Sequence, residues 1–253
     1  MSFASGADAY DRFMGRYSVT LSPLFTDFAG AEVAERVLDV GCGPGALTAE
    51  LTKRLGASAV TAIDPTEAFV AAVRERNPGV DVRQASAEKL PFPAGAFDAA
   101  LAQLVVHFMN DPVAGLAEMG RVTREGGVVA ACVWDHATGG RGPLSLFWDA
   151  ARELDPGSRS EAVLAGTGEG DLAKLFASAG LHEIEDGELA FDVEHETFED
   201  WWEPYTLGVG PVGVYVAGLH EERRQELRER CRALLPTAPF TLSIRAWAAK
   251  ARP

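Results

Sequence analysis

The sequence predicts an α/β fold organised around a mainly parallel sheet. Residues 37–40 form a short apolar strand, three alternate glycines follow it, and a helix is expected at 46–55. Short strands and helices then keep alternating to about residue 135, at the rhythm of right-handed βαβ units. Hydrophobic residues make up 47% of the 253 residues, so a core can be buried without disulfides.

The elements of the first half follow from apolar spacing and from helix punctuation. Apolar residues at helical spacing predict a helix at 19–29 that ends at Gly30, and Asp111-Pro112 begins a helix that ends near Thr123. Asp64 or Thr66 can cap a further helix that runs to about Arg76. The strands are expected at 37–40, 59–63, 80–84, 97–102 and 128–134.

The regular alternation stops after residue 135, and no linker or repeat divides the chain, so we expect one domain, 1–253. Trp201, Trp202 and Tyr205 lie in an aromatic cluster that is expected to be packing core, with a pocket wall as the alternative. The expected helices are 143–154, 171–179 and 221–235, and the expected strands are 182–193 and 240–247.

Charge and cysteine content exclude several classes of function. A formal net charge of −14 argues against the phosphate backbone of a nucleic acid as the main partner. The three cysteines, Cys42, Cys132 and Cys231, are far apart, so we expect neither a disulfide framework nor a metal site. The N-terminus has no signal-peptide pattern and no apolar run is long enough for a membrane span, so we expect a cytoplasmic protein.

The glycine turn permits two kinds of ligand. Gly41-x-Gly43-x-x-Ala46 matches a dinucleotide fingerprint, with Asp64 placed to bind a ribose diol. Asp39, two residues before the turn, would repel a pyrophosphate but would suit an ammonium group. S-adenosylmethionine (SAM) has an amino-acid end, a ribose and an adenine, and it has no phosphate. Asp39 therefore favours SAM over a nicotinamide dinucleotide.

Over residues 10–135 the chain resembles the class I SAM-dependent methyltransferases. The resemblance is closest to a small-molecule subgroup that includes the ubiquinone/menaquinone biosynthesis C-methyltransferases. Five blocks carry it, in the family's order and spacing. They are Val37-Leu38-Asp39-Val40-Gly41-Cys42-Gly43-Pro44-Gly45, Ile63-Asp64-Pro65, Ala87-Glu88-Lys89-Leu90-Pro91-Phe92 with Phe97-Asp98, Val106-His107-Phe108 with Asp111-Pro112, and Glu118 to Gly127.

The resemblance implies a Rossmann-like sheet of seven strands with the last strand antiparallel, helices on both faces and a helical cap. Residues 10–135 would be the cofactor-binding half. Insertions at 136–180 and 196–236 would cover a substrate pocket. Their aromatic and aliphatic composition predicts a small, partly apolar methyl acceptor.

The resemblance also implies roles for individual residues. The main chain around Gly41, Cys42 and Gly43 would hold the methionine moiety, with Asp39 near its ammonium group. Asp64 would bind both ribose hydroxyls. The family often has Asp where this chain has Ser86, and Glu88 is a possible substitute. The other expected contacts are Pro65 and Ala87 at the adenine, Gln103 and Leu104 near the sulfonium, and Arg16 at the carboxylate.

Each role has a plainer alternative. His107 is the best candidate for a general base, but a residue at that place can simply pack at a helix start. Asp39 can brace the loop, Asp64 can cap the next helix, and Arg16 can be solvated.

The predicted reaction is an in-line methyl transfer from SAM that releases S-adenosylhomocysteine. Two alternatives remain: a non-catalytic SAM-binding regulatory or assembly protein, and a nicotinamide-dependent oxidoreductase.

Overall fold

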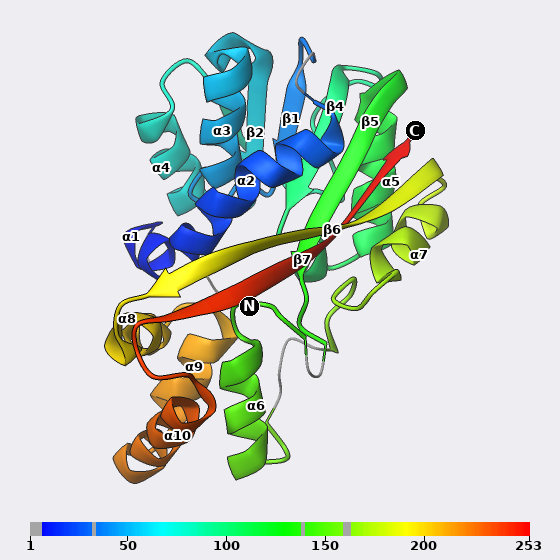
Figure 1. Ribbon diagram of the computed structural model, residues 1–253. Coiled ribbons are helices and arrows are strands. Elements are labelled where there is room, and N and C mark those ends of the chain that lie inside the picture. The colour runs from blue at the N-terminus through cyan, green and yellow to red at the C-terminus, as the bar shows by residue number, and fades with distance from the viewer. Residues whose placement is uncertain (1–6, 32–33, 138–139, 159–162) are drawn as a thin grey trace.

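Seven strands form one sheet in the order β3-β2-β1-β4-β5-β7-β6. A computed structural model describes residues 7–31, 34–137, 140–158 and 163–253. β1 to β5 pair in parallel, whereas β7 is antiparallel to both β5 and β6 (Figure 1). The predicted sheet with an antiparallel last strand is therefore confirmed. The strands are β1 Val37–Val40, β2 Val60–Asp64, β3 Asp81–Gln84, β4 Phe97–Gln103, β5 Thr123–Trp134, β6 His182–His195 and β7 Phe240–Arg252.

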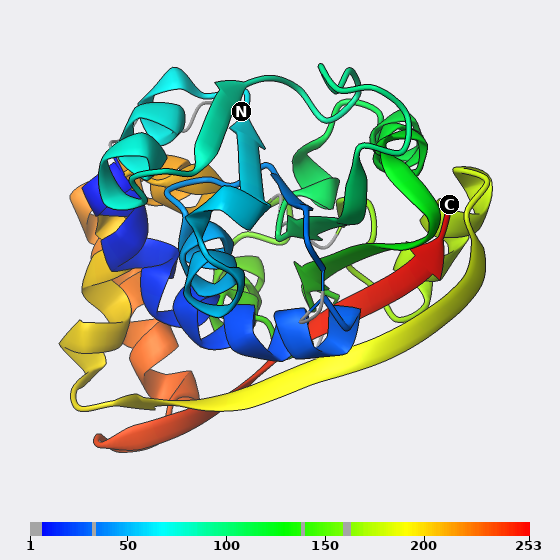
Figure 2. The same ribbon diagram turned by 90° about the horizontal axis from the view of Figure 1, so that it is seen from above.

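Helices cover both faces of the sheet (Figures 1 and 2). Side chains alternate along a strand, so Ala99 and Leu101 of β4 pack with α2 and α3, while Ala100 and Ala102 pack with α5 and α7. This double burial explains why the central strands are apolar throughout. The helices of the sheet region are α1 Ala7–Tyr10, η1 Asp11–Gly15, α2 Arg16–Ala29, α3 Ala46–Leu55, η2 Ala57–Ala59, α4 Glu67–Arg76, η3 Val106–Phe108, α5 Pro112–Val122 and α7 Asp171–Ser178.

Several elements extend beyond their predicted bounds. The N-terminal helix is continuous from residue 7 to 29 through a π-helical turn at Asp11–Gly15, and it ends at Gly30 with φ +66°. β5 begins at Thr123, which pairs with Phe97, rather than at residue 128; the register then shifts, and regular pairing with β4 continues from Val128. β7 continues to Arg252 and pairs with β6 along its length.

The cap is a cluster of helices at the far end of the long β6–β7 pair (Figure 1). Trp201, Trp202 and Tyr205 are buried there, and the Tyr205 hydroxyl donates to the Pro143 carbonyl over 3.2 Å. The interpretation of this cluster as packing core is confirmed. The cap elements are α6 Ser145–Leu154, α8 Phe198–Trp202, η5 Glu203–Thr206, α9 Gly210–Gly218 and α10 Glu221–Leu234.

Helix α9 was not predicted from the sequence. Its segment, Gly210–Gly218, is apolar nearly all round and contains three glycines, so it has neither an amphipathic period nor a high helix propensity. Tertiary packing of Val212 and Val216 stabilises it. Among the described residues, no helix has the length and apolar character needed to cross a bilayer.

Candidate functional site

A cavity of about 490 Å³ opens at the carboxyl ends of β1, β2 and β4. This is the edge where doubly wound sheets bind their ligands. It brings together every residue predicted to touch the cofactor except Arg16, and it adds His107. The predicted residues that line it are Asp39, Gly41, Cys42, Gly43, Asp64, Pro65, Ser86, Ala87, Glu88, Gln103, Leu104 and His107.

The glycine loop is tied to the neighbouring strand by its main chain. The N–H groups of Gly41 and Cys42 donate to the Ile63 carbonyl over 2.8 and 2.9 Å. Gly41 has φ +70°, and a Cβ atom there would lie 2.4 Å from Cγ2 of Val105. Glycine is required at this position both by the backbone conformation and by the close approach of Val105.

Asp39 lies under the loop, 1% exposed, and accepts a hydrogen bond of 2.6 Å from the Thr48 hydroxyl. Burial raises the pKa of its carboxyl to about 7, and the nearby charge of Asp64 adds to the rise. A positively charged ligand group beside Asp39 would favour the ionised form. Asp39 therefore braces the loop and also lines the cavity, so its two interpretations are compatible.

Asp64 ends β2 with both carboxylate oxygens engaged by main-chain groups. Oδ2 accepts from Gly43 N over 3.0 Å, and Oδ1 accepts from Thr66 N over 2.8 Å. Thr66 is the N-cap residue of α4, and its side chain makes no capping hydrogen bond. Each carboxylate oxygen has further acceptor capacity. The carboxylate is thus held in one orientation at the cavity wall, where it can still accept from ligand hydroxyls.

Ser86 and Glu88 form a local pair after β3. The Ser86 hydroxyl donates to the Glu88 carboxylate, whose Oε1 also accepts from Asn110 N over 2.8 Å. Because the serine proton is engaged with Glu88, the lone pairs of the serine oxygen remain the part that can receive a donor from a ligand.

Gln103 is oriented by α2. Its amide nitrogen donates to the Ser18 carbonyl over 3.2 Å and to the Ser22 hydroxyl over 3.0 Å. The Ser18 carbonyl can only accept, which fixes which end of the amide is nitrogen. Its Oε1 is buried without a hydrogen-bond partner among the described residues. This oxygen is a buried acceptor whose hydrogen-bonding capacity the described residues do not use.

His107 is buried in η3, and its Nδ1 has no hydrogen-bond partner in the described part of the chain. Burial lowers its pKa to about 3, and the neighbouring His136 lowers it further. The two ring centroids are 6.1 Å apart. Burial also lowers the pKa of His136 to about 4, and its Nδ1 is equally without a described partner. Both imidazoles are therefore neutral near pH 7.

The sequence prediction missed His136. It follows Trp134-Asp135 at the carboxyl end of β5, just as His107 follows the neighbouring β4. Ends of adjacent parallel strands meet at one sheet edge, so this placement was a usable signal.

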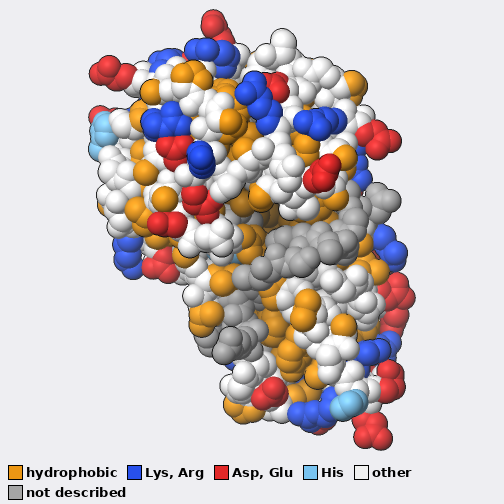
Figure 3. All heavy atoms as spheres, turned by 180° about the vertical axis from the view of Figure 1, so that it is seen from behind, with side chains coloured by type: hydrophobic (Ala, Val, Ile, Leu, Met, Phe, Trp, Pro, Cys, Tyr) orange, Lys and Arg blue, Asp and Glu red, His pale blue; other side chains and the backbone are white. Residues whose placement is uncertain are grey.

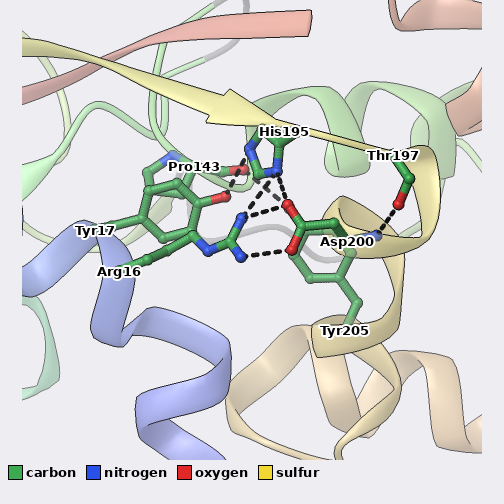
Figure 4. A network of polar contacts seen from close by, with 7 residues as sticks. All are labelled: Arg16, Tyr17, Pro143, His195, Thr197, Asp200 and Tyr205. Carbon is green, nitrogen blue, oxygen red and sulfur yellow. Dashed lines mark hydrogen bonds and ion pairs between the residues drawn. The ribbon is translucent and has the colours of Figure 1, made fainter. Parts of the chain in front are cut away.

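The role predicted for Arg16 is corrected by the structure. Its Nη2 and Nη1 atoms donate to the two carboxylate oxygens of Asp200 over 2.6 and 2.9 Å, and Nη1 lies 3.0 Å from His195 Nδ1 (Figure 4). Arg16 does not line the cavity. A guanidinium held by a bidentate carboxylate on the cap side is not placed to bind a cofactor carboxylate.

The charged side chains described in the cavity wall are all acidic. Its described lining includes the carboxyl groups of Asp39, Asp64 and Glu88 and contains no lysine or arginine. Within the described ranges there is also no group of three or more His, Cys, Asp or Glu side chains placed to bind a metal ion.

Residues 38–131 match the family model of the methyltransferase domain. This part of the chain is a methyltransferase domain. The match spans β1 to β5 and contains the glycine loop, Asp64 and His107, so it covers most of the cavity wall.

Proteins similar to this chain include several that are named as methyltransferases. It is 30% identical over 153 residues to an uncharacterized methyltransferase of Schizosaccharomyces pombe, with 52% of this chain and 54% of the relative covered. It is 32% identical to a probable S-adenosylmethionine-dependent methyltransferase of Mycolicibacterium smegmatis, with 67% and 65% covered. A ubiquinone/menaquinone biosynthesis C-methyltransferase UbiE of Bdellovibrio bacteriovorus is 32% identical, with 50% and 57% covered. The chain thus spans between half and two thirds of the length of these relatives.

Solved structures agree in fold over nearly the whole chain. The YcgJ protein of a Bacillus species superposes with a TM-score of 0.59 at 17% identity, covering 94% of this chain and 99% of that one. A putative methyltransferase of Bacillus halodurans gives 0.55 at 19% identity, covering 92% and 98%. The predicted Rossmann-like methyltransferase fold is confirmed.

Proposed function

We propose that the chain is a SAM-dependent methyltransferase that methylates a small, partly apolar molecule and releases S-adenosylhomocysteine. The observation that carries this proposal is the pair of buried carboxylates, Asp39 and Asp64, on either side of the glycine loop. A dinucleotide would bring its pyrophosphate close to Asp39, whereas SAM brings an ammonium group there and a ribose diol to Asp64.

The lining residues give each part of SAM a matching contact. Asp39 faces the ammonium group, the N–H-rich turn at Gly41, Cys42 and Gly43 binds the methionine moiety, and Asp64 accepts from the ribose hydroxyls. The adenine contacts are Pro65, Ser86, Ala87 and Glu88, and those near the sulfonium are Gln103 and Leu104.

The bound cofactor supplies an electrophilic methyl group, and the chain binds, orients and desolvates the reactants. A sulfonium loses its positive charge in the reaction, so no strong acid is required in the wall. His107 is the cavity residue suited to receive a proton when the nucleophile must lose one.

The acceptor side is assigned to the cap segment 136–180. Its Leu164 lines the cavity, whereas no described residue of 196–236 does. We therefore assign the first segment to acceptor contact and the second to packing behind it, within a single functional unit of residues 1–253.

We further propose that the enzyme works in the cytoplasm without nucleic acid. Lysine, arginine and acidic side chains are intermixed on the face seen in Figure 3, with no basic field there, and the net charge is −14.

Substitution of Asp64 tests the cofactor site. Asp64→Asn should weaken binding of S-adenosylhomocysteine about 10- to 100-fold, because hydrogen bonds to a charged group contribute about 1.5–3 kcal/mol. Calorimetric titration measures the change. Asp149→Asn, on α6 away from the cavity, is the control and should bind normally. Equal affinity of Asp64→Asn and the unmodified protein would remove Asp64 from the site.

An enzyme and a non-catalytic SAM-binding protein would both bind S-adenosylhomocysteine in the titration. A turnover assay distinguishes them. Formation of S-adenosylhomocysteine from SAM that depends on an added small acceptor supports the enzyme. A screen of hydroxyl, amine, thiol and carbon acceptors without turnover would favour the non-catalytic alternative.

A further inference from the structure

The charge of the cavity restricts the acceptor. Asp39, Asp64 and Glu88 all belong to the wall, and its described lining has no lysine or arginine to oppose a second anion. A carboxylate or phosphate on the acceptor would lose its hydration and face acidic side chains, without gaining a counter-charge from the protein. The wall therefore disfavours anionic acceptors.

The sheet edge separates a cofactor end from an acceptor end. Along this edge the ends of β3, β2 and β1 carry the residues assigned to adenine, ribose and methionine. The next strands in the order, β4 and β5, end near His107 and His136. The apolar side chains Leu104, Val105 and Phe108, which follow β4, also belong to the cavity lining.

His107 is a buried polar side chain that lacks a partner. It is 6% exposed, it lines the cavity, and its Nδ1 makes no hydrogen bond with any described residue. Buried polar groups are nearly always hydrogen-bonded, so this unpaired nitrogen has a hydrogen-bonding capacity that the described residues do not use. A neutral imidazole has one N–H donor and one acceptor nitrogen, which matches a hydroxyl group.

We propose that the β4–β5 end of the cavity binds an uncharged, partly apolar acceptor through a hydroxyl group that hydrogen-bonds to His107. This inference rests on the methyltransferase function proposed above and narrows its substrate class to alcohols or phenols.

The chemistry balances with this histidine as a weak base. A hydroxyl oxygen attacks the methyl carbon with a lone pair, the carbon–sulfur bond breaks, and its electrons remain on sulfur. The proton of the hydroxyl moves to the imidazole and then to solvent. Oxygen becomes strongly acidic as the new bond forms, so a base whose pKa is lowered to about 3 is sufficient.

An ammonium group fits this site less well than a hydroxyl. It has no lone pair until it is deprotonated, and a base as weak as His107 cannot remove that proton beforehand.

Fragment binding tests the assignment with three matched probes. Protein saturated with S-adenosylhomocysteine is titrated calorimetrically with 4-propylphenol, 4-propylbenzoate and 4-propylbenzylamine at pH 7. The phenol should bind at least 10-fold more tightly than either charged probe, and His107→Phe should weaken its binding at least 10-fold. His182→Phe, at an exposed position on β6, is the matched control and should bind the phenol normally.

The outcomes separate the two proposals. No binding of S-adenosylhomocysteine contradicts the methyltransferase function and the acceptor assignment with it. If S-adenosylhomocysteine binds, the acceptor assignment alone is overturned by any of three results: a charged probe that binds as tightly as the phenol, no binding of the phenol, or unchanged phenol affinity in His107→Phe.

Discussion

At the scale of single residues, Asp39 shows how a binding-site side chain can lower the stability of the protein when no ligand is bound. Its carboxyl is 1% exposed, and its one side-chain partner is Thr48 among the described residues. Desolvation disfavours the charged form in the fold but not in the unfolded chain. The buried carboxylate therefore lowers the stability of the empty protein, and a cationic ligand group beside it would offset this loss.

Asp39→Asn should raise the stability of the empty protein and weaken cofactor binding. The pKa of Asp39 rises from 3.8 to about 7 on folding, so the native state holds more protons between these values. Its contribution to stability therefore falls as pH rises from about 4 to about 7 and stays lost above. Thermal unfolding should show the variant close to the unmodified protein at pH 4.5 and more stable at pH 8, by an amount on the order of a few kcal/mol.

The same variant should bind S-adenosylhomocysteine at least 10-fold more weakly at pH 8, because its amide cannot pair with the ammonium group. At pH 8 we therefore expect Asp39→Asn to be more stable than the unmodified protein and to bind S-adenosylhomocysteine more weakly. A stability difference that is the same at pH 4.5 and pH 8 would contradict the buried, proton-holding carboxyl.

At the scale of elements, the glycine loop has two glycines with different requirements. Gly41 and Gly43 both have positive φ, but a Cβ atom would meet Val105 only at Gly41, since nothing lies within 4 Å at Gly43. Gly43→Ala should cost about 1–2 kcal/mol of backbone strain. Gly41→Ala should cost more, because Val105 or the loop must also move. Chemical denaturation measures both, and equal losses would show that Val105 does not limit the turn.

The ion pair between Arg16 and Asp200 ties the N-terminal helix to the cap. We expect Arg16→Met to lower stability by about 1–2 kcal/mol, since both side chains are partly exposed. Affinity for S-adenosylhomocysteine should be unchanged, because Arg16 lies outside the cavity lining.

A double-mutant cycle with Asp200→Asn should show positive coupling between the two positions. A loss of affinity of 10-fold or more in Arg16→Met would restore the cofactor-carboxylate role that its sequence position suggested.

The difference between these cases shows what sequence could predict. The loop, Asp39 and Asp64 lie in one stretch where strand, turn and helix follow directly, so local spacing placed β1 and α3 at the bounds the structure has. Arg16 and Asp200 are 184 residues apart, and nothing local reveals the pairing. Helix α9 was missed because it depends on tertiary packing. His136 was missed although its place after a predicted strand was a usable signal.

At the scale of the whole molecule, one apolar cluster runs from α2 through the sheet into the cap. The cavity lies at the sheet edge, between the glycine loop and residues of the N-terminal helical segment such as Tyr10 and Ser18. The cap helices α8, α9 and α10 do not contribute described residues to its wall. We therefore expect the cofactor half to determine which cofactor binds, and helices α8, α9 and α10 to support the fold without contacting the cofactor.

The central claim is that this cavity binds a cofactor without phosphate. Calorimetric titration of the purified protein with S-adenosylhomocysteine and, separately, with NAD tests it most directly. The structure predicts one-site binding of S-adenosylhomocysteine that is weakened about 10- to 100-fold in Asp64→Asn, and no measurable binding of NAD. Tight binding of NAD with no response to S-adenosylhomocysteine would contradict the assignment.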